Sequence, residues 1–418
     1  MLVATQEHSS ETAVDKTEGL NFLLLILIAN FLTPDSYGEM SLFTTFVTLI
    51  GYAICLSGEG YAAISYFKES ESEYKSTISS IILLPCVIFF LLVLVVFISS
   101  IFTNRLFDLA IRDVYYALLI TLCTVYIHVG LDYFRVRERI LTYGKLSCSY
   151  ALLNFILTII LIVHVKLDWH GRIYALLVCS LFYALIFIYI LVRDHRFAVS
   201  SISYSTIKKV AIWGIPLIPH LASSWIRQGG DRYIIRANYD MTEVGIFSFA
   251  LNLVSVLCMV GVAFNSSNSV DIYKSLSKPS DNTIDRLHNY TKKMLLIYAV
   301  ISIMLLLVCI VLIPLLLPQY TDSLGFFALL VPYGYLQCIY FLYCNYLFFY
   351  GENKQMMKIT FITSIIHLIL SFILTRYSLF ATAIVYTITQ FLVVLLLRFK
   401  VTKVLHNKLP NYIVDWVL

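Results

Sequence analysis

Apolar stretches of about 20 residues follow one another along almost the whole chain, and they constrain its fold more than any other feature. A helix of that length is needed to cross the hydrocarbon core of a bilayer, which is about 30 Å thick. Of the 418 residues, 60% are hydrophobic and 13% are charged, and the mean hydropathy is +0.83. Water-soluble domains do not have this composition. The sequence therefore predicts an all-α polytopic membrane protein, because helices satisfy their own backbone hydrogen bonds in lipid.

Hydrophobic runs between charged breaks predict 12 spanning helices, arranged as two lobes of six. The helices are expected near residues 19 to 33, 41 to 65, 78 to 102, 114 to 134, 145 to 165, 172 to 193, 209 to 235, 243 to 268, 293 to 317, 325 to 350, 355 to 375 and 378 to 398. The domains are then a polar N-terminal segment (1–18), an N-terminal lobe (19–193), a cytoplasmic linker (194–208), a C-terminal lobe (209–398) and a cytoplasmic tail (399–418).

The first predicted helix is short, because Gly19 to Leu32 is only 14 residues, or about 21 Å of helix. Either its neighbours shelter it, or the start of the chain is unusual. A secretory signal is a third interpretation, but the start carries no basic cluster and no small-x-small cleavage site follows the apolar run.

Lysine and arginine residues predict the orientation, since short basic loops stay on the cytoplasmic side. With the N-terminus inside, 22 of the 30 Lys and Arg residues lie in inner segments, so both termini are expected in the cytoplasm. The net charge of +5 then reflects topology and does not indicate nucleic acid. All nine cysteines fall in predicted spans without metal-ligand spacing, so we expect small buried side chains, with no metal and no cofactor.

A short pattern recurs 207 residues apart. "PDSYGEMSLF" (34–43) matches "MTEVGIFSFA" (241–250), which pairs Gly38 with Gly245 and Ser41 with Ser248. Such a short match can arise by chance, but it lies before the second and the eighth predicted helix and divides the chain into six plus six. We therefore expect a parallel repeat, as in transporters with two lobes around a central site. The glycine is expected to permit a sharp turn, and the serine a close approach of helices.

Three stretches resemble the Wzx-type flippases of lipid-linked oligosaccharides, a polysaccharide transporter family of the MOP superfamily. They are "FLTPDSYGEMSLFTTFVTLIGYAICLSGEGYAAISYF", "WGIPLIPHLASSWIRQGGDRYIIRANYDMTEVGIFSFA" and "YGENKQMMKITFITSIIHLILSFIL". The resemblance implies a MATE-like fold and the movement of undecaprenyl-pyrophosphate-linked O-antigen or polysaccharide repeat units across the bacterial inner membrane. It also implies contact with membrane lipids, and a polysaccharide polymerase and a chain-length regulator as further partners.

Charged residues gather at the end of the seventh predicted helix, where Arg227 and Asp231 share one helical stripe and Arg232 and Arg236 another. One stripe can be neutralised by its aspartate while the other binds phosphate through paired donors. The alternative is an ion-pair network at the outer interface. In the tenth predicted helix, residues of a further stripe suit sugar faces, although helix packing uses tyrosine in the same way. They are Tyr333, Gln337, Tyr340 and Tyr343.

Ion coupling is a hypothesis for Glu59, Asp132 and His220, because ionisable groups inside membranes are often functional. Glu59 is also close to Lys68 in sequence, so a structural pair is an alternative. His128, His164 and His367 can titrate as well, but a single histidine is more often a packing residue. A predicted cytoplasmic collar of basic residues would attract anionic head groups. It consists of Arg135, Arg137 and Arg139.

Two other functions remain open at this stage. A membrane-integral polymerase or glycosyl transferase would be an enzyme, but such enzymes usually carry a large extramembrane loop or an acidic metal-binding pair, and the sequence contains no Asp-x-Asp. A multidrug exporter of the same superfamily is the closer alternative, because the fold does not fix the substrate. An exporter of cations should have an acidic cavity, whereas the seventh predicted helix is basic.

Overall fold

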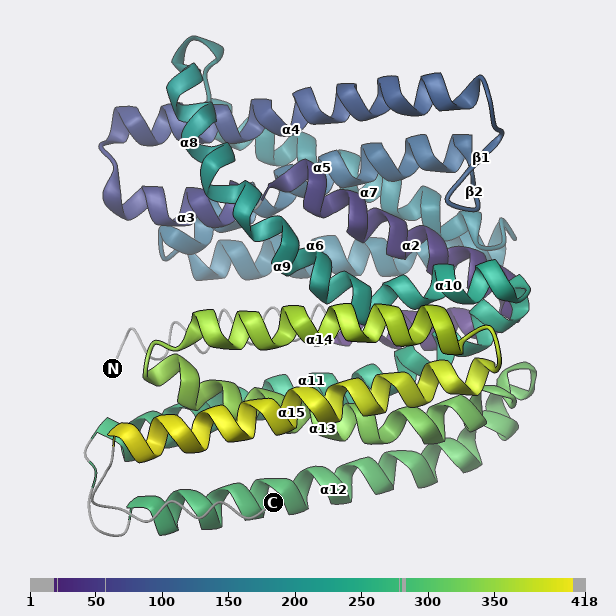
Figure 1. Cartoon of the computed structure of the whole chain (residues 1–418). Helices are drawn as coiled ribbons and strands as arrows, with labels where there is room; N and C mark the ends of the chain where they lie inside the picture. Colours follow the sequence, from purple (N-terminus) through teal and green to yellow (C-terminus); the bar gives the residue numbers. More distant parts are fainter. Residues whose placement is uncertain (1–18, 21, 57, 278, 280–282, 409–418) are drawn as a thin grey trace. The chain divides into compact units, whose positions relative to one another are not determined.

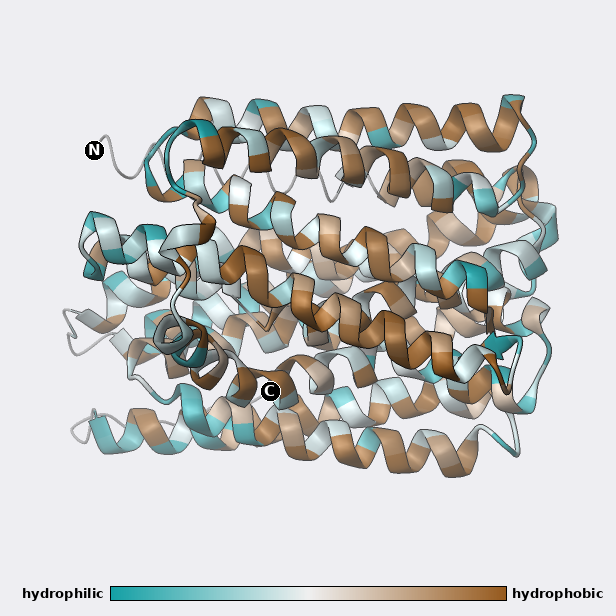
Figure 2. Cartoon of the chain, turned by 90° about the horizontal axis from the view of Figure 1, so that it is seen from above, coloured by the Kyte–Doolittle hydropathy of each residue, from teal (hydrophilic) through white to brown (hydrophobic). Residues whose placement is uncertain are grey.

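The described chain is helical along most of its length in the computed structural model (Figure 1). The structure describes residues 19–20, 22–56, 58–277, 279 and 283–408, apart from the side chains of Glu59, His220 and Gln228. Ten segments of this part are long and apolar enough to cross a membrane, namely Pro34–Lys68, Glu71–Ser100, Ile111–Val136, Ile140–His164, His170–Arg193, Met241–Ser277, Thr283–Leu316, Ser323–Phe349, Asn353–Leu374 and Leu379–Lys408. Figure 2 shows hydrophobic residues along the middle of many helices and hydrophilic residues near their ends. The predicted fold class is confirmed.

Two of the twelve predicted helices are not among these ten segments. Residues 19–20 and 22–29 of the first are helical, and its remaining positions include one that is outside the described residues. The seventh, predicted at 209 to 235, is broken into several short helices. The predicted tail begins as helix, since the last segment continues to Lys408, and residues 409–418 lie outside the described part.

The chain divides into two compact units, with the boundary between Trp225 and Ile226. This boundary falls inside the broken seventh helix, and the predicted linker at 194–208 stays a prediction. The described elements of unit 1 are α2 (Pro34–Cys55), α3 (Gly58–Lys68), α4 (Glu71–Ser100), β1 (Arg105–Leu106), β2 (Leu109–Ala110), α5 (Ile111–Val136), α6 (Ile140–Ile159), η1 (Ile160–His164), α7 (His170–Arg193), η2 (Val199–Ser201), α8 (Tyr204–Gly214), η3 (Ile215–Leu217) and α9 (Ile218–Trp225).

Unit 2 continues from the same broken helix and contains five long helices. Its elements are η4 (Ile226–Gly230), α10 (Asp231–Asn238), α11 (Met241–Ser277), α12 (Thr283–Leu316), η5 (Pro318–Tyr320), α13 (Ser323–Phe349), α14 (Asn353–Leu374) and α15 (Leu379–Lys408). In unit 1, the only strands that the structure describes form a small hairpin, in which Arg105 pairs with Ala110 and Leu106 with Leu109. This hairpin joins α4 to α5 (Figure 1).

The recurring pattern corresponds to two helix starts with the same capping geometry. Thr33 Oγ1 accepts a hydrogen bond from Ser36 N at 3.3 Å before α2, and Asp240 Oδ1 accepts one from Glu243 N at 3.0 Å before α11. Both caps and both donors are 207 residues apart. The explanation offered for the glycine is wrong, because Gly38 lies inside α2 and Gly351 is the only described glycine with positive φ. In both copies the chain turns at the residue that caps the helix. The turn therefore does not require a left-handed backbone conformation at Gly38.

The same helix pairs pack within each unit. In unit 1, α5 lies against α2, α4 and α7, and α6 lies against α7; in unit 2, α13 lies against α11, α12 and α15, and α14 lies against α15. With α2 matched to α11, α4 to α12, α5 to α13, α6 to α14 and α7 to α15, each of these pairs of unit 1 has its counterpart in unit 2. This packing agrees with the predicted parallel repeat.

Glycine allows a close approach of two helices in unit 1. A Cβ atom built on Gly130 of α5 would lie 2.2 Å from Cδ1 and 2.6 Å from Cβ of Phe187, which is buried on α7. The Cβ of Phe187 cannot turn away as a ring can, so a larger residue at position 130 must separate the two helices.

We expect Gly130→Ala to destabilise the protein by about 1–3 kcal/mol, which is the usual cost of overpacking a core. The measurement is thermal unfolding of the purified protein in detergent. Gly51→Ala is the matched control, because a Cβ there would meet only Thr121 Cγ2, at 3.9 Å. Equal unfolding temperatures for Gly130→Ala and the wild type would contradict the close α5–α7 approach.

Candidate functional site

The seventh predicted helix is broken in two places. Pro216 lies in the 3-10 turn η3 and Pro219 at the start of α9, and each lacks the N–H that a regular helix requires. The second break is the π-helix η4, which contains Gly229 and Gly230 and places Asp231 at the start of α10. Single π-helical turns are frequent at functional sites.

Arg232 on α10 is buried within unit 2, with 8% of its surface exposed. Its Nε donates a hydrogen bond to Ser248 Oγ on α11 at 2.9 Å. Ser248 is the serine of the recurring pattern, so in this unit the pattern supplies an acceptor that orients a buried cation. The helices α10 and α11 lie close together at this serine, and the hydrogen bond between Arg232 and Ser248 joins them.

Arg232 also lines a pocket of about 260 Å³ between α11 and α13. The other lining residues are Leu251, Asn252, Ser255, Cys258, Tyr333, Gln337 and Phe341. A guanidinium, two amides and two hydroxyl groups therefore surround one cavity, together with aromatic rings. Such a set can bind an anion and neighbouring hydroxyl groups at the same time.

The other predicted substrate residues are spread around this pocket. Arg227 in η4 interacts electrostatically with Tyr333 and Tyr340 of α13. The Nη1 atom of Arg236 lies 3.4 Å from the carbonyl oxygen of Tyr239 at the end of α10. Of the tyrosine stripe, Tyr333 and Gln337 line the pocket, whereas Tyr340 and Tyr343 are not among its lining residues.

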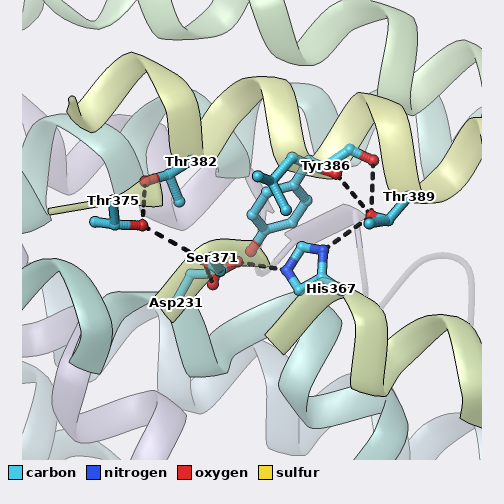
Figure 3. Close-up of polar contacts among 8 residues, drawn as sticks. Asp231, His367, Ser371, Thr375, Thr382, Tyr386 and Thr389 are labelled. Carbon is cyan, nitrogen blue, oxygen red and sulfur yellow. Dashed lines mark hydrogen bonds and ion pairs between the residues drawn. The ribbon is translucent and has the colours of Figure 1, made fainter. Parts of the chain in front are cut away.

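Asp231 points toward α14, where its carboxylate meets two buried partners (Figure 3). The Ser371 hydroxyl donates to Oδ1, and His367 Nε2 lies 2.8 Å from Oδ2. The side chains of both Asp231 and His367 are 1% exposed. On the other side of the imidazole, Nδ1 lies 2.9 Å from Thr389 Oγ1 of α15. The Tyr386 ring packs edge-on against the imidazole, with a centroid distance of 4.9 Å.

From the sequence, Asp231 is a candidate only for substrate binding, and His367 is one of several histidines in helices. The two residues are 136 positions apart, and no local pattern pairs them. Buried serine and threonine residues at helical spacing on α14, such as Thr360, Ser364 and Ser371, are the signal that this helix has a polar face.

Of the three predicted ion-coupling residues, only Asp132 has a side chain that the structure describes. The side chains of Glu59 and His220 lie outside the described residues. Asp132 forms a salt bridge with Arg135, 2.9 Å between Oδ1 and Nη2. Arg135 thus belongs to a local pair at the end of α5.

The other two collar residues differ in their surroundings. Arg137 stacks on the Tyr133 ring at 4.2 Å and donates to its hydroxyl, whereas Arg139 is exposed. Tyr133 donates in turn to Asp194. Burial raises the pKa of Asp194, but the hydrogen bond from Tyr133 and the nearby Arg193 guanidinium lower it more, so this pKa lies below its usual value. Within unit 1, Arg137 is therefore part of a hydrogen-bonded cluster at the ends of α5 and α7.

Unit 1 contains a second pocket of about 260 Å³, at the position that corresponds to the first one. It lies between α2 and α5, the counterparts of α11 and α13, and its lining residues are Val47, Thr48, Gly51, Tyr52, Cys55, Thr121, Thr124, Val125 and His128. Thr48 and Gly51 are offset by 207 from Ser255 and Cys258. Among the described lining residues there is no arginine, lysine, aspartate or glutamate, so the described linings of the two pockets occupy matching helix pairs but differ in charge.

Arg172, at the start of the sixth predicted helix, is buried in unit 1 with 8% of its surface exposed. Its Nη1 donates to Asn154 Oδ1 at 2.9 Å and to Thr158 Oγ1 at 3.0 Å, both on α6. No local pattern in the sequence indicates this role, because the arginine lies at the predicted end of a helix.

Buried charged groups and polar pockets among apolar helices, in two units with the same packing plan, define a polytopic membrane protein with polar sites inside its helix bundles. Two solved structures share the fold. An inward-facing multidrug resistance MATE family transporter of the MOP superfamily is 14% identical, with a TM-score of 0.74, covering 92% of this chain and 94% of that chain. The lipid II flippase MurJ in an inward closed conformation is 15% identical, with a TM-score of 0.73, covering 94% and 87%.

Residues 12–270 match the family model of polysaccharide biosynthesis proteins, and the chain belongs to this family. Two relatives come from Haemophilus influenzae. The Lsg locus putative protein 1 is 26% identical over 366 residues, which is 83% of this chain and 84% of that protein. An uncharacterized membrane protein is 23% identical over 370 residues, with the same coverage. The sequence match gives the family, and the two solved structures show the fold that this chain shares with them.

We expect Ser248→Ala to destabilise the protein by about 1–3 kcal/mol, because the buried Nε–H of Arg232 loses its serine acceptor. Thermal unfolding in detergent measures the effect. Ser255→Ala is the control, since the Ser255 hydroxyl donates to the carbonyl of Asn252 in its own helix. If both variants unfold at the wild-type temperature, the Arg232–Ser248 contact contributes nothing to the fold.

Proposed function

We propose that this protein moves lipid-linked oligosaccharides, namely O-antigen or other polysaccharide repeat units on undecaprenyl pyrophosphate, from the cytoplasmic to the outer leaflet of a bacterial inner membrane. Transport would proceed by alternating access of two lobes, with both termini in the cytoplasm. The observation that carries the proposal is the Arg232 pocket of unit 2, a buried cationic site with amide and hydroxyl groups around it.

The chemistry of such a substrate matches this pocket. A pyrophosphate dianion and a hydrated sugar cannot cross hydrocarbon unaided, because unpaired charges and polar groups are costly there. Arg232 offers paired N–H donors to a phosphate, and its contact with Ser248 orients the guanidinium before the substrate arrives. In this proposal Arg227 and Arg236 add positive charge near Arg232. Asp231 of α10 has a separate role, in its contact with α14.

The sugar part would contact the neutral groups of the pocket. Tyr333 offers an aromatic face with a hydroxyl group, and Asn252, Ser255 and Gln337 offer donors and acceptors. Tyr340 and Tyr343 would extend this surface along α13. The predicted basic collar of Arg135, Arg137 and Arg139 would attract anionic head groups to the cytoplasmic side, and a polymerase and a chain-length regulator would use the product.

The fold alone also suits a multidrug exporter, and one of the structural relatives is described as a multidrug resistance transporter. The charge of the pocket favours an anionic substrate instead, because Arg232 is its only charged lining residue among those described. A cationic drug would meet repulsion there. An anionic lipid-linked head group would meet attraction.

We expect Arg232→Ala to reduce flipping of lipid-linked oligosaccharide by about 10- to 150-fold, because a hydrogen bond to a charged group contributes about 1.5–3 kcal/mol. The measurement is translocation of a fluorescent isoprenyl-pyrophosphate oligosaccharide in proteoliposomes. Arg376→Ala is the control, since Arg376 stacks on Phe372 at 4.3 Å and does not line the pocket.

Two results would contradict the proposal. One is wild-type flipping by Arg232→Ala, with equal amounts of protein in the membrane. The other is efflux of a cationic dye by the same proteoliposomes without any movement of the oligosaccharide, which would identify a drug exporter. Deleting the gene gives a cellular test, because lipid-linked single repeats should then accumulate on the inner leaflet.

A further inference from the structure

The end of α11 and the start of α12 line a further pocket of unit 2, of about 120 Å³. Its position on α11 separates it from the Arg232 pocket, because Asp271 lies 13 residues after Cys258, or about 20 Å along the helix. The site is therefore independent of the proposed function. Its lining residues are Asp271, Ser275, Arg286, Leu287 and Tyr290.

One side of this pocket can accept hydrogen bonds but has no proton to donate. The Ser275 hydroxyl donates to the carbonyl oxygen of Asp271 at 2.8 Å, and the Tyr290 hydroxyl donates to Asn268 Oδ1 at 2.6 Å. A hydroxyl has a single proton, so neither is available to the Asp271 carboxylate, although Tyr290 interacts with it electrostatically. The half-buried carboxylate of Asp271 thus keeps its capacity to accept for a ligand.

The other side of the pocket carries a positive charge. Arg286 is exposed, and it makes no hydrogen bond or salt bridge with any residue that the structure describes. Its guanidinium offers paired N–H donors, which match the oxygens of a phosphate. Arg286 and Asp271 line the same pocket but form no salt bridge with each other, so the space between them separates two opposite charges.

We propose that this pocket binds the head group of a phosphatidylethanolamine lipid, with the phosphate on Arg286 and the primary ammonium on Asp271. A zwitterion of this kind neutralises both charges at once. Its ammonium also supplies the N–H donors that the acidic side of the pocket lacks. The volume of about 120 Å³ holds a few water molecules or a small polar group, and not an acyl chain.

The surface of α12 beside the pocket suits the acyl chains of such a lipid. Leu296, Val300, Ile303 and Leu307 are exposed and follow one another at helical spacing. Tyr290 lies six residues before Leu296, or about 9 Å along the helix. With this apolar face in the hydrocarbon, the pocket therefore lies at the level of the lipid head groups.

An anionic lipid is the alternative occupant, because Lys274, Lys292 and Lys293 are exposed at the same ends of α11 and α12. Basic residues at a membrane surface attract anionic lipids. These lysines do not belong to the described lining of the pocket, whereas Asp271 does. A carboxylate next to the phosphate disfavours a lipid with net negative charge and favours one that carries an ammonium group.

Unit 1 shows that the repeated scaffold does not require this carboxylate. With the offset of 207 residues that relates α11 to the start of unit 1, Asp271 corresponds to Ile64 of α3. Ile64 is apolar and exposed. The acidic group is thus a feature of unit 2 alone, as expected if it serves a ligand rather than the packing of the two helices.

The experiment measures the binding of single lipids to the purified full-length protein by native mass spectrometry. The probes are phosphatidylethanolamine, phosphatidylcholine and phosphatidylglycerol with the same acyl chains. Phosphatidylcholine keeps the phosphate and the positive charge but has no N–H donor, and phosphatidylglycerol has no positive charge. We expect the wild-type protein to bind phosphatidylethanolamine at least about tenfold more tightly than either of the others, because a hydrogen bond between charged groups is lost with each.

Two variants assign the preference to the pocket. Asp271→Asn should reduce the preference for phosphatidylethanolamine to less than about threefold, because the amide carries no charge to attract an ammonium. Arg286→Gln should weaken the binding of phosphatidylethanolamine by about tenfold. Lys293→Gln is the matched control, since Lys293 is exposed on the same helix and is not a lining residue, and it should keep the wild-type preference. Unfolding temperatures measured without added lipid show whether each variant is folded.

Three results would overturn this inference. Equal binding of the three lipids by the wild-type protein would mean that the pocket selects no head group. Tighter binding of phosphatidylglycerol, unaffected by Asp271→Asn, would identify an anionic lipid as the occupant. Displacement of phosphatidylethanolamine by water-soluble glycerophosphoethanolamine at equal concentration would show that a soluble phosphoethanolamine compound, and not a lipid, is the ligand. None of these results bears on the Arg232 pocket, so the proposed function is tested separately.

Discussion

The hydrocarbon core of a membrane supplies no hydrogen bonds, and this constraint determines most of the structure. Backbone groups are satisfied within long helices, and the described charged side chains that are buried have partners inside their own unit. Arg172 is held by an amide and a hydroxyl, Arg232 by a serine, and Asp231 by a histidine and a serine. Every such group is costly to bury in a membrane. Each of them therefore marks a position where function or helix packing requires a polar side chain.

The order and approximate positions of ten spanning helices could be predicted from the sequence, because the apolar runs act locally. Their ends could not, since α11, α12 and α15 extend well beyond their apolar runs. The breaks of the seventh helix were only partly visible, since Pro216 and Pro219 signal the first but nothing local signals a π-helix at 226–230. The glycine of the repeat was assigned to a turn because its position inside α2 depends on the cap at Thr33. The pairing of Asp231 with His367 depends on tertiary packing and could not be predicted.

Matching helix pairs in the two units place their polar groups at corresponding positions, and sequence differences give these groups different charges. The two pockets occupy matching helix pairs, yet only the pocket of unit 2 contains a charged residue among the lining side chains that the structure describes. The polar residues of α6 and α14 occupy matching positions, yet one pair holds an arginine and the other holds an aspartate. A parallel repeat thus preserves the scaffold while each copy changes its charges independently.

The short helix α10 connects two kinds of chemistry because successive residues of a helix point in different directions. Asp231 contacts α14, and Arg232 lies against α11 and the pocket, so one turn of backbone carries both the carboxylate and the guanidinium. A shift of α10 away from α14 would therefore also move the guanidinium relative to Ser248. The glycines of η4 immediately before Asp231 make such a shift less costly, since they add no side chains that would have to repack.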